Sequence, residues 1–226
     1  MRLKSLAKKY KTDKLILGYI KKYEKYFNSK QYEEITLVEV GVLEGKSLKM
    51  WRDYFPNGKI YGIDIFKHKT AESDFKMLNK EGRIKVYKAD QNNKKQMKDV
   101  IKEILKHSGN KGIDIAIDDG MHYNHSLVHT FGRLFPHLNS DGIYVAEDVA
   151  YCNENTAKKG KYKNIILDVR TQFKEWEKTG KFRVITSSGV EDELLSIKEQ
   201  DYISKWIRAI KIPNIIRKSM IAVFKK

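Results

Sequence analysis

Two acidic clusters, each closing an apolar stretch, are the residues of this chain best suited to chemistry. Asp118 and Asp119 end one stretch and are followed at short range by His122, and Glu147 and Asp148 end a later stretch. Neighbouring strands of a parallel sheet lie about 4.8 Å apart, and their carboxyl ends open on the crevice where α/β proteins bind ligands. If the two stretches are neighbouring strands, their acids converge on one hard cation beside the imidazole. The pattern therefore predicts an enzyme site.

A glycine-rich turn, Gly41-x-x-x-Gly45-Lys-Ser47, follows the first apolar stretch of the chain. Glycines let the backbone turn tightly and approach a ligand, and a helix after the turn offers unpaired N–H groups. The spacing is neither the G-x-G-x-x-G of dinucleotide binders nor a Walker P-loop. The turn alone is also compatible with a tight loop that binds nothing.

Two further strand ends carry polar groups that suit a nucleoside. Asp64 lies near the end of the second apolar stretch, where a carboxylate can accept both hydroxyls of a ribose. Asp90 and Gln91 end the third stretch, at the edge where an adenine ring would lie. For each acid alone, a turn-capping role is the favoured alternative. Together with the glycine turn, they predict an adenosine-containing ligand.

Strand-length apolar runs alternate with helix-length polar segments, and this alternation predicts an α/β fold with right-handed crossovers and a mostly parallel sheet. The expected strands are 35–40, 59–65, 84–90, 113–119 and 142–149, and the expected helices are 46–54, 71–80, 94–107 and 125–138.

The ends of the chain are expected to extend this core within a single domain, 1–226. Residues 1–33 form an N-terminal helical segment, 34–150 the cofactor- and metal-binding core, and 151–226 a variable acceptor-side region. In the first segment, Ile16, Ile20, Tyr23 and Phe27 predict an amphipathic helix that Asp13 caps. In the last region we expect a loop at 151–162, a helix at 165–176, strands at 181–187 and 220–224 with 194–197 as a competing strand, and a packed helix and turn at 203–217 in preference to a membrane-surface helix.

Composition sets broad limits on location and partners. The chain has 226 residues and one cysteine, Cys152, which fits a reducing compartment. No apolar stretch approaches the roughly 18 residues of a membrane span, so we expect a cytoplasmic protein. The formal charge of +16 attracts polyanions, but only 8 of 45 basic residues are Arg, and the lysines are spread over the whole chain. A solvated lysine surface is favoured over a polyanion site.

The motifs occur in order along the chain, and together they resemble the macrocin and mycinamicin O-methyltransferase family. Members of this family are class I S-adenosylmethionine enzymes that methylate sugar hydroxyls. The motifs are Glu39-x-Gly41-x-x-x-Gly45-x-Ser47, Asp64, Asp90-Gln91, Asp118-Asp119-Gly-x-His122, Leu134-Phe-Pro-x-Leu138 and Glu147-Asp148, and the N-terminal Tyr10-Lys-Thr12-Asp13-Lys14 with Tyr19 and Tyr23 is also similar. The resemblance spans residues 7 to 149.

The resemblance implies a Rossmann-like class I methyltransferase fold, with a mostly parallel seven-stranded sheet and helices on both faces. It implies that S-adenosyl-L-methionine and Mg²⁺ are the cofactors. The implied cofactor-binding residues are Glu39, Gly41, Gly45, Ser47, Asp64, Asp90, Gln91 and Asp118, the implied Mg²⁺ ligands are Asp119, Glu147 and Asp148, and the implied proton acceptor is His122. Met121 and Asn93 depart from the pattern, where Ser and an acid are usual.

The predicted function is therefore Mg²⁺-dependent O-methylation of a sugar hydroxyl. The substrate is expected to be a small molecule or glycan that carries a sugar diol, such as a natural-product glycoside or a polysaccharide precursor. Three alternatives stay open: a methyltransferase of RNA or another polyanion, a cephalosporin-hydroxylase-like relative on the same scaffold, and a basic adaptor without chemistry. Nucleic acid is disfavoured because no Asn/Asp-Pro-Pro-aromatic element follows the fourth strand. A homo-oligomer is compatible with the basic C-terminal segment.

A zinc site is a further alternative for the histidines at and just before the fourth helix-length segment, 125–138. His122, His125 and His129 are spaced by three and four residues, which places them along one helical face. A zinc site of three imidazoles must direct all three at one point. We expect His129 to face the neighbouring packing instead, so zinc is disfavoured.

Overall fold

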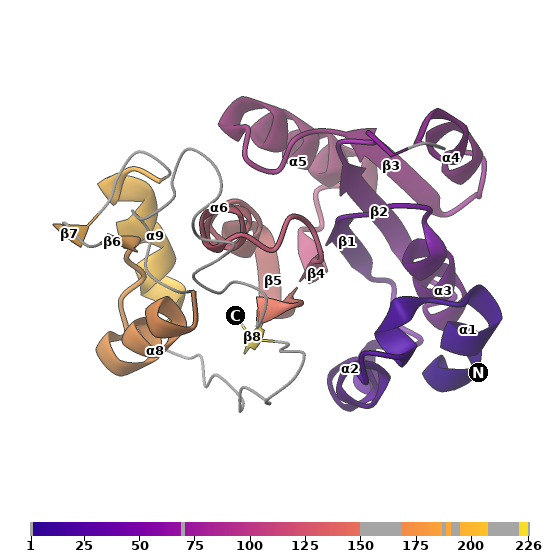
Figure 1. Ribbon diagram of the computed structural model, residues 1–226, viewed down its shortest axis with the longest axis horizontal. Helices are drawn as coiled ribbons and strands as arrows, with labels where there is room; N and C mark the ends of the chain where they lie inside the picture. Colours follow the sequence, from indigo (N-terminus) through magenta and orange to yellow (C-terminus); the bar gives the residue numbers. More distant parts are fainter. Residues whose placement is uncertain are drawn as a thin grey trace.

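A six-stranded sheet forms the centre of the protein (Figure 1). The structure is a computed structural model, and it describes residues 2–68, 71–149, 169–186, 189–190, 195–207 and 222–225. The strands are β1 (Thr36–Val40), β2 (Lys59–Asp64), β3 (Ile84–Lys88), β4 (Ile113–Asp118), β5 (Leu138–Ala146) and β8 (Ala222–Lys225), in the spatial order β3-β2-β1-β4-β5-β8. The first five are mutually parallel, and β8 is antiparallel to β5. The order reverses between β1 and β4, the position where open α/β sheets bind ligands.

Helices cover both faces of the sheet, as the alternation of apolar runs predicted. They are α3 (Lys46–Tyr54), α4 (Ala71–Leu78), α5 (Lys94–Ser108), α6 (Asn124–Leu134), α8 (Val169–Thr179) and α9 (Ile197–Ile207). Successive residues of a strand point to opposite faces. Leu37 and Ile115 therefore join one core with residues of the N-terminal segment and α3, while Val38 and Ala116 join a second core with residues of α5, α6, α8 and α9. The α/β prediction is confirmed.

Local signals place the ends of the helices. Helix α5 begins after Asn93, whose side chain accepts a hydrogen bond from the Gln96 N–H at 3.1 Å, and it ends at Gly109 in the left-handed region. Helix α6 is shorter than the predicted 125–138, because Pro136 lies in a single 3₁₀ turn, η3 (Phe135–His137), that leads directly into β5.

The N-terminal segment is helical, but not as one continuous helix. Two short helices, α1 (Leu3–Tyr10) and α2 (Ile20–Phe27), are separated by the 3₁₀ turn η1 (Asp13–Leu15), and a second turn, η2 (Asn28–Lys30), follows α2. The predicted helix through Ile16 is wrong in its first turn, because Gly18 adopts φ +76° and Ile16 is 89% exposed. Asp13 does not cap α2, which begins after Tyr19.

The seven-stranded sheet is wrong for the part of the chain that the structure describes. The predicted strand 181–187 contributes only β6 (Ile185–Thr186), which pairs with β7 (Gly189–Val190) in a separate ribbon. Phe182 and Val184 are buried, and they pack in the core beside α8 rather than in the sheet. The predicted strand 220–224 is confirmed as β8, shifted by one residue at its end.

Several C-terminal predictions lie outside the described residues: the loop at 151–162 with Cys152, the start of the helix at 165–176, and most of the helix and turn at 203–217. Among the residues that are described, no helix combines the length and the apolar character that crossing a bilayer requires.

Candidate active site

A cavity of about 520 Å³ opens at the carboxyl ends of β1 to β4, beside the N-terminal segment. This volume lies within the roughly 300–1,000 Å³ of small-molecule pockets. Its lining carries six carboxylates against two lysines, namely Asp13, Glu44, Asp64, Asp90, Asp119 and Asp148 against Lys11 and Lys46. An excess of carboxylates attracts cations and repels anions. The cavity therefore suits a positively charged ligand.

The glycine turn forms one wall of this cavity. Gly41 adopts φ +88°, and its N–H donates to the Ile63 carbonyl at 2.9 Å, which holds the turn against β2. A Cβ at Gly41 would lie 2.0 Å from the carbonyl oxygen of Asp119. Gly45, at φ +73°, starts α3 and packs against Leu78 without lining the cavity. The turn thus needs glycine chiefly to let β1 and β4 approach each other beside the cavity.

We expect Gly41→Ala to destabilise the fold far more than Gly82→Ala. Both glycines have positive φ, but a Cβ at Gly82 meets nothing within 4 Å. The Gly82 variant should therefore lose about 1–2 kcal/mol of its free energy of unfolding, the cost of left-handed backbone for a residue with a Cβ. The Gly41 variant must also displace the Asp119 backbone, and its loss should reach the exceptional range above about 4 kcal/mol. Urea unfolding of both variants measures the difference, and equal losses would contradict the close approach.

Asp64 holds the glycine turn with two hydrogen bonds and accepts a third from the loop that follows β2. Its Oδ2 accepts from the N–H groups of Val42 at 2.7 Å and Leu43 at 3.0 Å, and its Oδ1 accepts from Phe66 N–H at 2.7 Å. A carboxylate offers about four lone-pair sites. In this conformation Asp64 has acceptor capacity for about one further donor, rather than for both hydroxyls of a ribose.

Asp90 and Gln91 line the cavity after β3, and the side chains of both also form hydrogen bonds with other residues of the chain. Asp90 Oδ1 accepts from the Asn92 N–H at 2.9 Å, which is a local turn. Gln91 is buried; its Oε1 accepts from the Met121 N–H at 2.8 Å and its Nε2 donates to Thr130 Oγ1 at 2.9 Å. Gln91 therefore joins the end of β3 to the loop that follows β4.

Asp118 is fully buried and does not line the cavity. Its side chain accepts from the Tyr144 hydroxyl at 3.2 Å and from the Gly120 N–H at 3.3 Å. Burial raises its pKa to about 7, although both hydrogen bonds oppose the rise. In this structure Asp118 holds the loop after β4 through its hydrogen bond with the Gly120 N–H.

The register of the sheet brings the two acidic clusters together. Asp118 pairs with Ala146, and the ladder continues beyond both strands: the Asp119 N–H donates to the Val40 carbonyl at 2.8 Å, and the Glu147 N–H to the Asp118 carbonyl at 2.9 Å. Because side chains alternate between faces, Asp119 and Glu147 point to the face opposite Asp118. The prediction that β4 and β5 are neighbours is confirmed.

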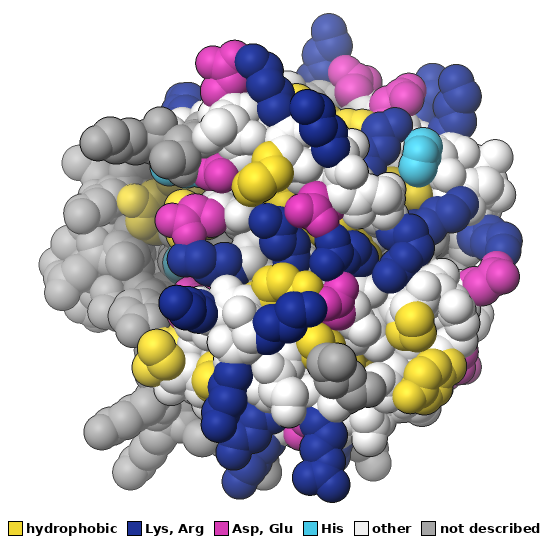
Figure 2. Space-filling model, turned by 90° about the vertical axis from the view of Figure 1, so that its right-hand side faces the viewer, with side chains coloured by type: hydrophobic (Ala, Val, Ile, Leu, Met, Phe, Trp, Pro, Cys, Tyr) yellow, Lys and Arg dark blue, Asp and Glu magenta, His cyan; other side chains and the backbone are white. Residues whose placement is uncertain are grey.

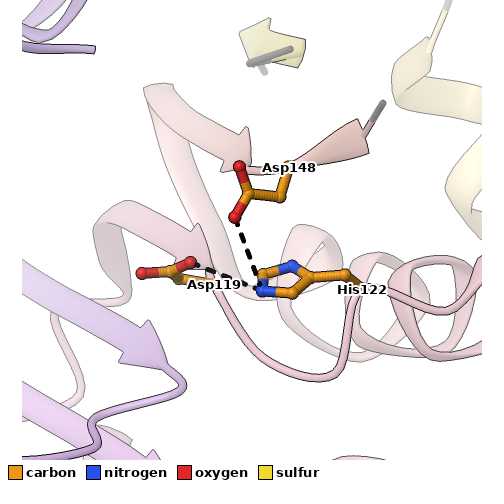
Figure 3. Close-up of side chains that lie close together, drawn as sticks. All are labelled: Asp119, His122 and Asp148. Atoms are coloured by element: carbon orange, nitrogen blue, oxygen red, sulfur yellow. Dashed lines mark ion pairs between the residues drawn. The ribbon is translucent and has the colours of Figure 1, made fainter. Parts of the chain in front are cut away.

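His122 lies between Asp119 and Asp148 (Figure 3). Its Nε2 is 3.9 Å from Asp119 Oδ1 and 3.6 Å from Asp148 Oδ2. Both His122, at φ +52°, and Asp148, at φ +54°, adopt left-handed backbone, which is uncommon for residues other than glycine. All three side chains line the cavity. Such strain concentrates at functional sites.

The acids divide into two groups that each have the geometry of a cation site, and Asp119 belongs to both. One group is Asp119, His122 and Asp148, and the other is Glu39, Asp119 and Glu147; within each group the ligand atoms lie within 4.8 Å of one another. The three acids predicted as Mg²⁺ ligands do not form one such group among the described residues. Glu39 accepts from Ser47 Oγ at 2.8 Å, and burial raises its pKa to about 6.

Lys14 was not among the predicted site residues, yet its ammonium lies among the acids. Its Nζ is 2.5 Å from Asp119 Oδ2, 2.7 Å from Glu147 Oε1 and 3.2 Å from Glu39 Oε1. Burial lowers the pKa of Lys14, but the three carboxylates outweigh it and raise that pKa above its ordinary value. The Thr12-Asp13-Lys14 motif was the signal available in the sequence.

The structure disfavours a zinc site on α6. His129 is buried; its Nδ1 bonds the Gln91 carbonyl and its Nε2 accepts from Arg133 at 3.5 Å. The His125 ring lies beside the Tyr123 ring, 5.7 Å between centroids. Among the described residues, no candidate metal group contains His125 or His129.

The buried His129 should make the protein less stable in acid. Burial, helped by Arg133, lowers its pKa to about 4, whereas an unfolded histidine titrates near about 6.5. The unfolded state thus binds more protons between these values, so stability is lost as pH falls from 6.5 towards 4, by up to about 3 kcal/mol. His129→Gln should remove this loss. Urea unfolding at pH 7, 5.5 and 4 tests it, and parallel pH profiles of wild type and variant would contradict it.

The chain is similar to known methyltransferases. Residues 38–149 match the family model described as a methyltransferase domain. The chain is 36% identical over 155 residues to the 8-demethyl-8-alpha-L-rhamnosyl tetracenomycin-C 2'-O-methyltransferase of Streptomyces olivaceus, an alignment that covers 65% of this chain and 37% of that relative. It is 31% identical over 156 residues to the mycinamicin VI 2''-O-methyltransferase of Micromonospora griseorubida, covering 65% and 36%. The chain thus spans about a third of the length of the curated relatives it matches.

A solved structure shares the fold. The chain superposes on the MycE methyltransferase, solved with Mg, SAH and mycinamycin VI, with a TM-score of 0.67 and 23% identity. The match covers all of this chain and 53% of that one. The Rossmann-like methyltransferase fold is therefore confirmed. Residues 38–149 match a methyltransferase domain, and the chain is similar in sequence to the mycinamicin and demethylmacrocin O-methyltransferases, as its motifs indicated.

Proposed function

We propose that the protein transfers a methyl group from S-adenosylmethionine to a sugar hydroxyl, with the help of Mg²⁺. The observation that carries this proposal is His122, held between Asp119 and Asp148 at the edge of an acidic cavity. Relatives named as sugar O-methyltransferases support it. An imidazole between two carboxylates suits a base that acts beside a cation.

The cavity fits the donor because S-adenosylmethionine is a cation with a nucleoside. We propose that Gly41, Asp64, Asp90 and Gln91 contact it, since all four line the cavity. Glu39, Gly45, Ser47 and Asp118 were predicted with them; we propose that Ser47 lines the donor site and that the other three support it from outside the cavity lining.

The acids fit a divalent cation. Oxygen ligands are those that Mg²⁺ prefers, and Glu147 Oε2 is buried without a hydrogen-bond partner among the described residues. We propose that Asp119 and Asp148 hold the ion and that Glu147 completes its site through this oxygen. When bound, the donor supplies an electrophilic methyl group and the cation lowers the pKa of a coordinated hydroxyl.

The residues of the chain then remove one proton from the acceptor hydroxyl. His122 Nε2 faces the two acids and is the atom placed to accept the proton of the acceptor hydroxyl. The hydroxyl oxygen forms the new bond to the methyl carbon as the carbon–sulfur bond breaks. Asp119 and Asp148, on either side of the ring, stabilise the imidazolium that results.

The acidic lining favours a sugar diol over RNA as the acceptor. A phosphate chain would meet six carboxylates at the cavity. Figure 2 shows lysine and arginine side chains interspersed with acidic and apolar ones on the face it presents, rather than gathered into one stripe.

We also propose that residues 1–226 act as one methyltransferase domain. The cytoplasmic location and a homo-oligomer stay predictions.

Methylation of defined glycosides tests the proposal. The full chain is incubated with S-adenosylmethionine, Mg²⁺ and rhamnosyl or other 6-deoxyhexosyl aryl glycosides, and mass spectrometry detects the gain of one methylene. We expect turnover of acceptors with vicinal hydroxyls and none of their deoxy analogues, which lack one hydroxyl. Methylation of RNA but of no glycoside, or hydroxylation of the acceptor, would contradict the proposal.

A further inference from the structure

Lys14 occupies a position among carboxylates that a cation would take. Its side chain is 1% exposed, and among lysines whose burial the structure describes it alone is buried. It reaches Asp119 and Glu147 from η1, more than a hundred residues earlier in the chain. A buried ammonium is costly unless oppositely charged groups surround it. The cluster of Glu39, Asp119 and Glu147, called here the inner cluster, supplies three.

Two tyrosines of the N-terminal segment donate hydrogen bonds to acids of the site. One binds Asp148, which lies outside the inner cluster, and the other binds Glu147, which belongs to it. The Tyr19 hydroxyl donates to Asp148 Oδ1, and the Tyr23 hydroxyl donates to Glu147 Oε1. Both tyrosines are buried, and they lie one turn apart at the start of α2. Together with Lys14, the N-terminal segment thus gives a donor to each of the three acids proposed as metal ligands.

Each of the three acids proposed as metal ligands binds the N-terminal segment through one carboxylate oxygen, and its second oxygen does not bind that segment. Asp119 Oδ2, Glu147 Oε1 and Asp148 Oδ1 bind the N-terminal segment. Their second oxygens accept no hydrogen bond from the residues that the structure describes; Asp119 Oδ1 and Asp148 Oδ2 face His122, and Glu147 Oε2 is buried without a partner.

The described part of the site carries more negative charge than positive charge. Among the described residues, four carboxylates, Glu39, Asp119, Glu147 and Asp148, meet one ammonium. Like charges this close repel strongly in a poorly solvated interior. One ammonium and one divalent ion together offset three of the four charges. Without Lys14, the inner cluster is a set of three hard oxygen ligands of the kind that divalent ions bind.

We propose that Lys14 is the resident cation of the inner cluster, that it confines the site to one divalent ion, and that Tyr19 and Tyr23 are positioning residues for the ligands of that ion. The inference rests on the proposed metal site, which it deepens. It assigns to the N-terminal segment a role in metal binding and not only in covering the sheet.

Manganese titration of the full chain, without donor or acceptor, tests the proposal. Electron paramagnetic resonance counts free Mn²⁺, used as the probe for Mg²⁺. We expect wild type to bind one ion per chain and Lys14→Met to bind two. Glu39→Gln added to Lys14→Met removes one negative charge with the positive one, and it should return the count to one.

The tyrosines give a separate readout. Tyr19→Phe and Tyr23→Phe should keep one ion but weaken its binding about 10–100-fold, as the loss of partners behind metal ligands does. Tyr26→Phe is the matched control: it lies on the same helix, is half-buried, and its hydroxyl bonds none of the acids. Binding by this control should equal that of wild type.

Each outcome decides the inference. Folded Lys14→Met that binds one ion at wild-type affinity overturns it, and so does a Lys14→Met protein that stays unfolded in millimolar Mn²⁺, since the ion should replace the missing charge. Recovery of folding on adding Mn²⁺ supports it. A wild type that binds no ion while Lys14→Met binds one supports Lys14 as the resident cation of the inner cluster and overturns the Mg²⁺ site proposed at Asp119 and Asp148.

Discussion

His122→Asn is expected to lower turnover of a sugar acceptor by roughly 10²–10⁴-fold, the range that a general base contributes. His122 Nε2 is the one basic nitrogen that faces both Asp119 and Asp148 in the described cavity lining. Asparagine suits this position because, like histidine, it tolerates the left-handed backbone found there. Its amide cannot accept a proton at neutral pH. The variant therefore removes the base with little change in backbone conformation.

The matched control for this prediction is His125→Asn. His125 lies three residues further along, on α6, is half-buried and does not line the cavity. Its turnover should stay within a few-fold of wild type. Calorimetry with S-adenosylmethionine should give similar donor affinity for wild type and both variants. If His122→Asn loses donor binding together with turnover, His122 is a structural residue of the cavity and not the base.

The alternation of strands and helices was readable from the sequence because the core is built on it. Leu37 and Val38 face opposite cores, as do Ile115 and Ala116, so each strand is apolar on both sides. The same alternation separates Asp118 from Asp119. Counting positions along β4 would have placed Asp118 on one face of the sheet and Asp119 on the other, the face of Glu39, but the motifs by themselves do not make that distinction.

The contacts of the N-terminal segment were not predictable in the same way. Lys14 is one of many lysines in a basic chain, and nothing local distinguishes a lysine that is buried from one that is solvated. Its position depends on contacts with Asp119 and Glu147, far along the chain. The predicted helix through Ile16 failed for a related reason: Gly18 ends that periodicity, and η1 turns instead to bring Lys14 to the acids.

The prediction of a seven-stranded sheet failed because a short apolar run can be buried either as a strand of the sheet or in a core beside helices. The run at 181–187 has the composition of a strand, yet Phe182 packs against Trp176 and Phe131. Val184 is buried in the same core, beside α6 and α8. Burial by helices satisfies the same side chains as burial in a sheet, so periodicity does not separate the two. The run at 220–224 differs because the edge of β5 offers it backbone partners.

Asp119→Asn is expected to remove divalent-cation binding and to lower turnover at least about a thousandfold, since a bound cation supplies several kcal/mol to such a reaction. Asp119 is the acid that the two groups share: its Oδ2 binds Lys14 and its Oδ1 faces His122. Asparagine keeps the shape of the side chain and removes its charge. The variant should fold, because Lys14 retains Glu39 and Glu147 as partners.

Asp114→Asn is the control for this variant, because Asp114 lies on the same strand, β4, at the end away from the cavity. There its carboxylate accepts from the Thr36 N–H and from Asn139 Nδ2, both at 2.8 Å. Turnover with and without EDTA, together with Mn²⁺ titration, measures both variants. The control should bind one ion and lose activity to EDTA, with Mg²⁺ restoring it. Wild-type turnover that persists in excess EDTA would remove the metal from the mechanism. An Asp119→Asn protein that still binds the ion would contradict Asp119 as its ligand, because both candidate metal groups among the described residues contain Asp119.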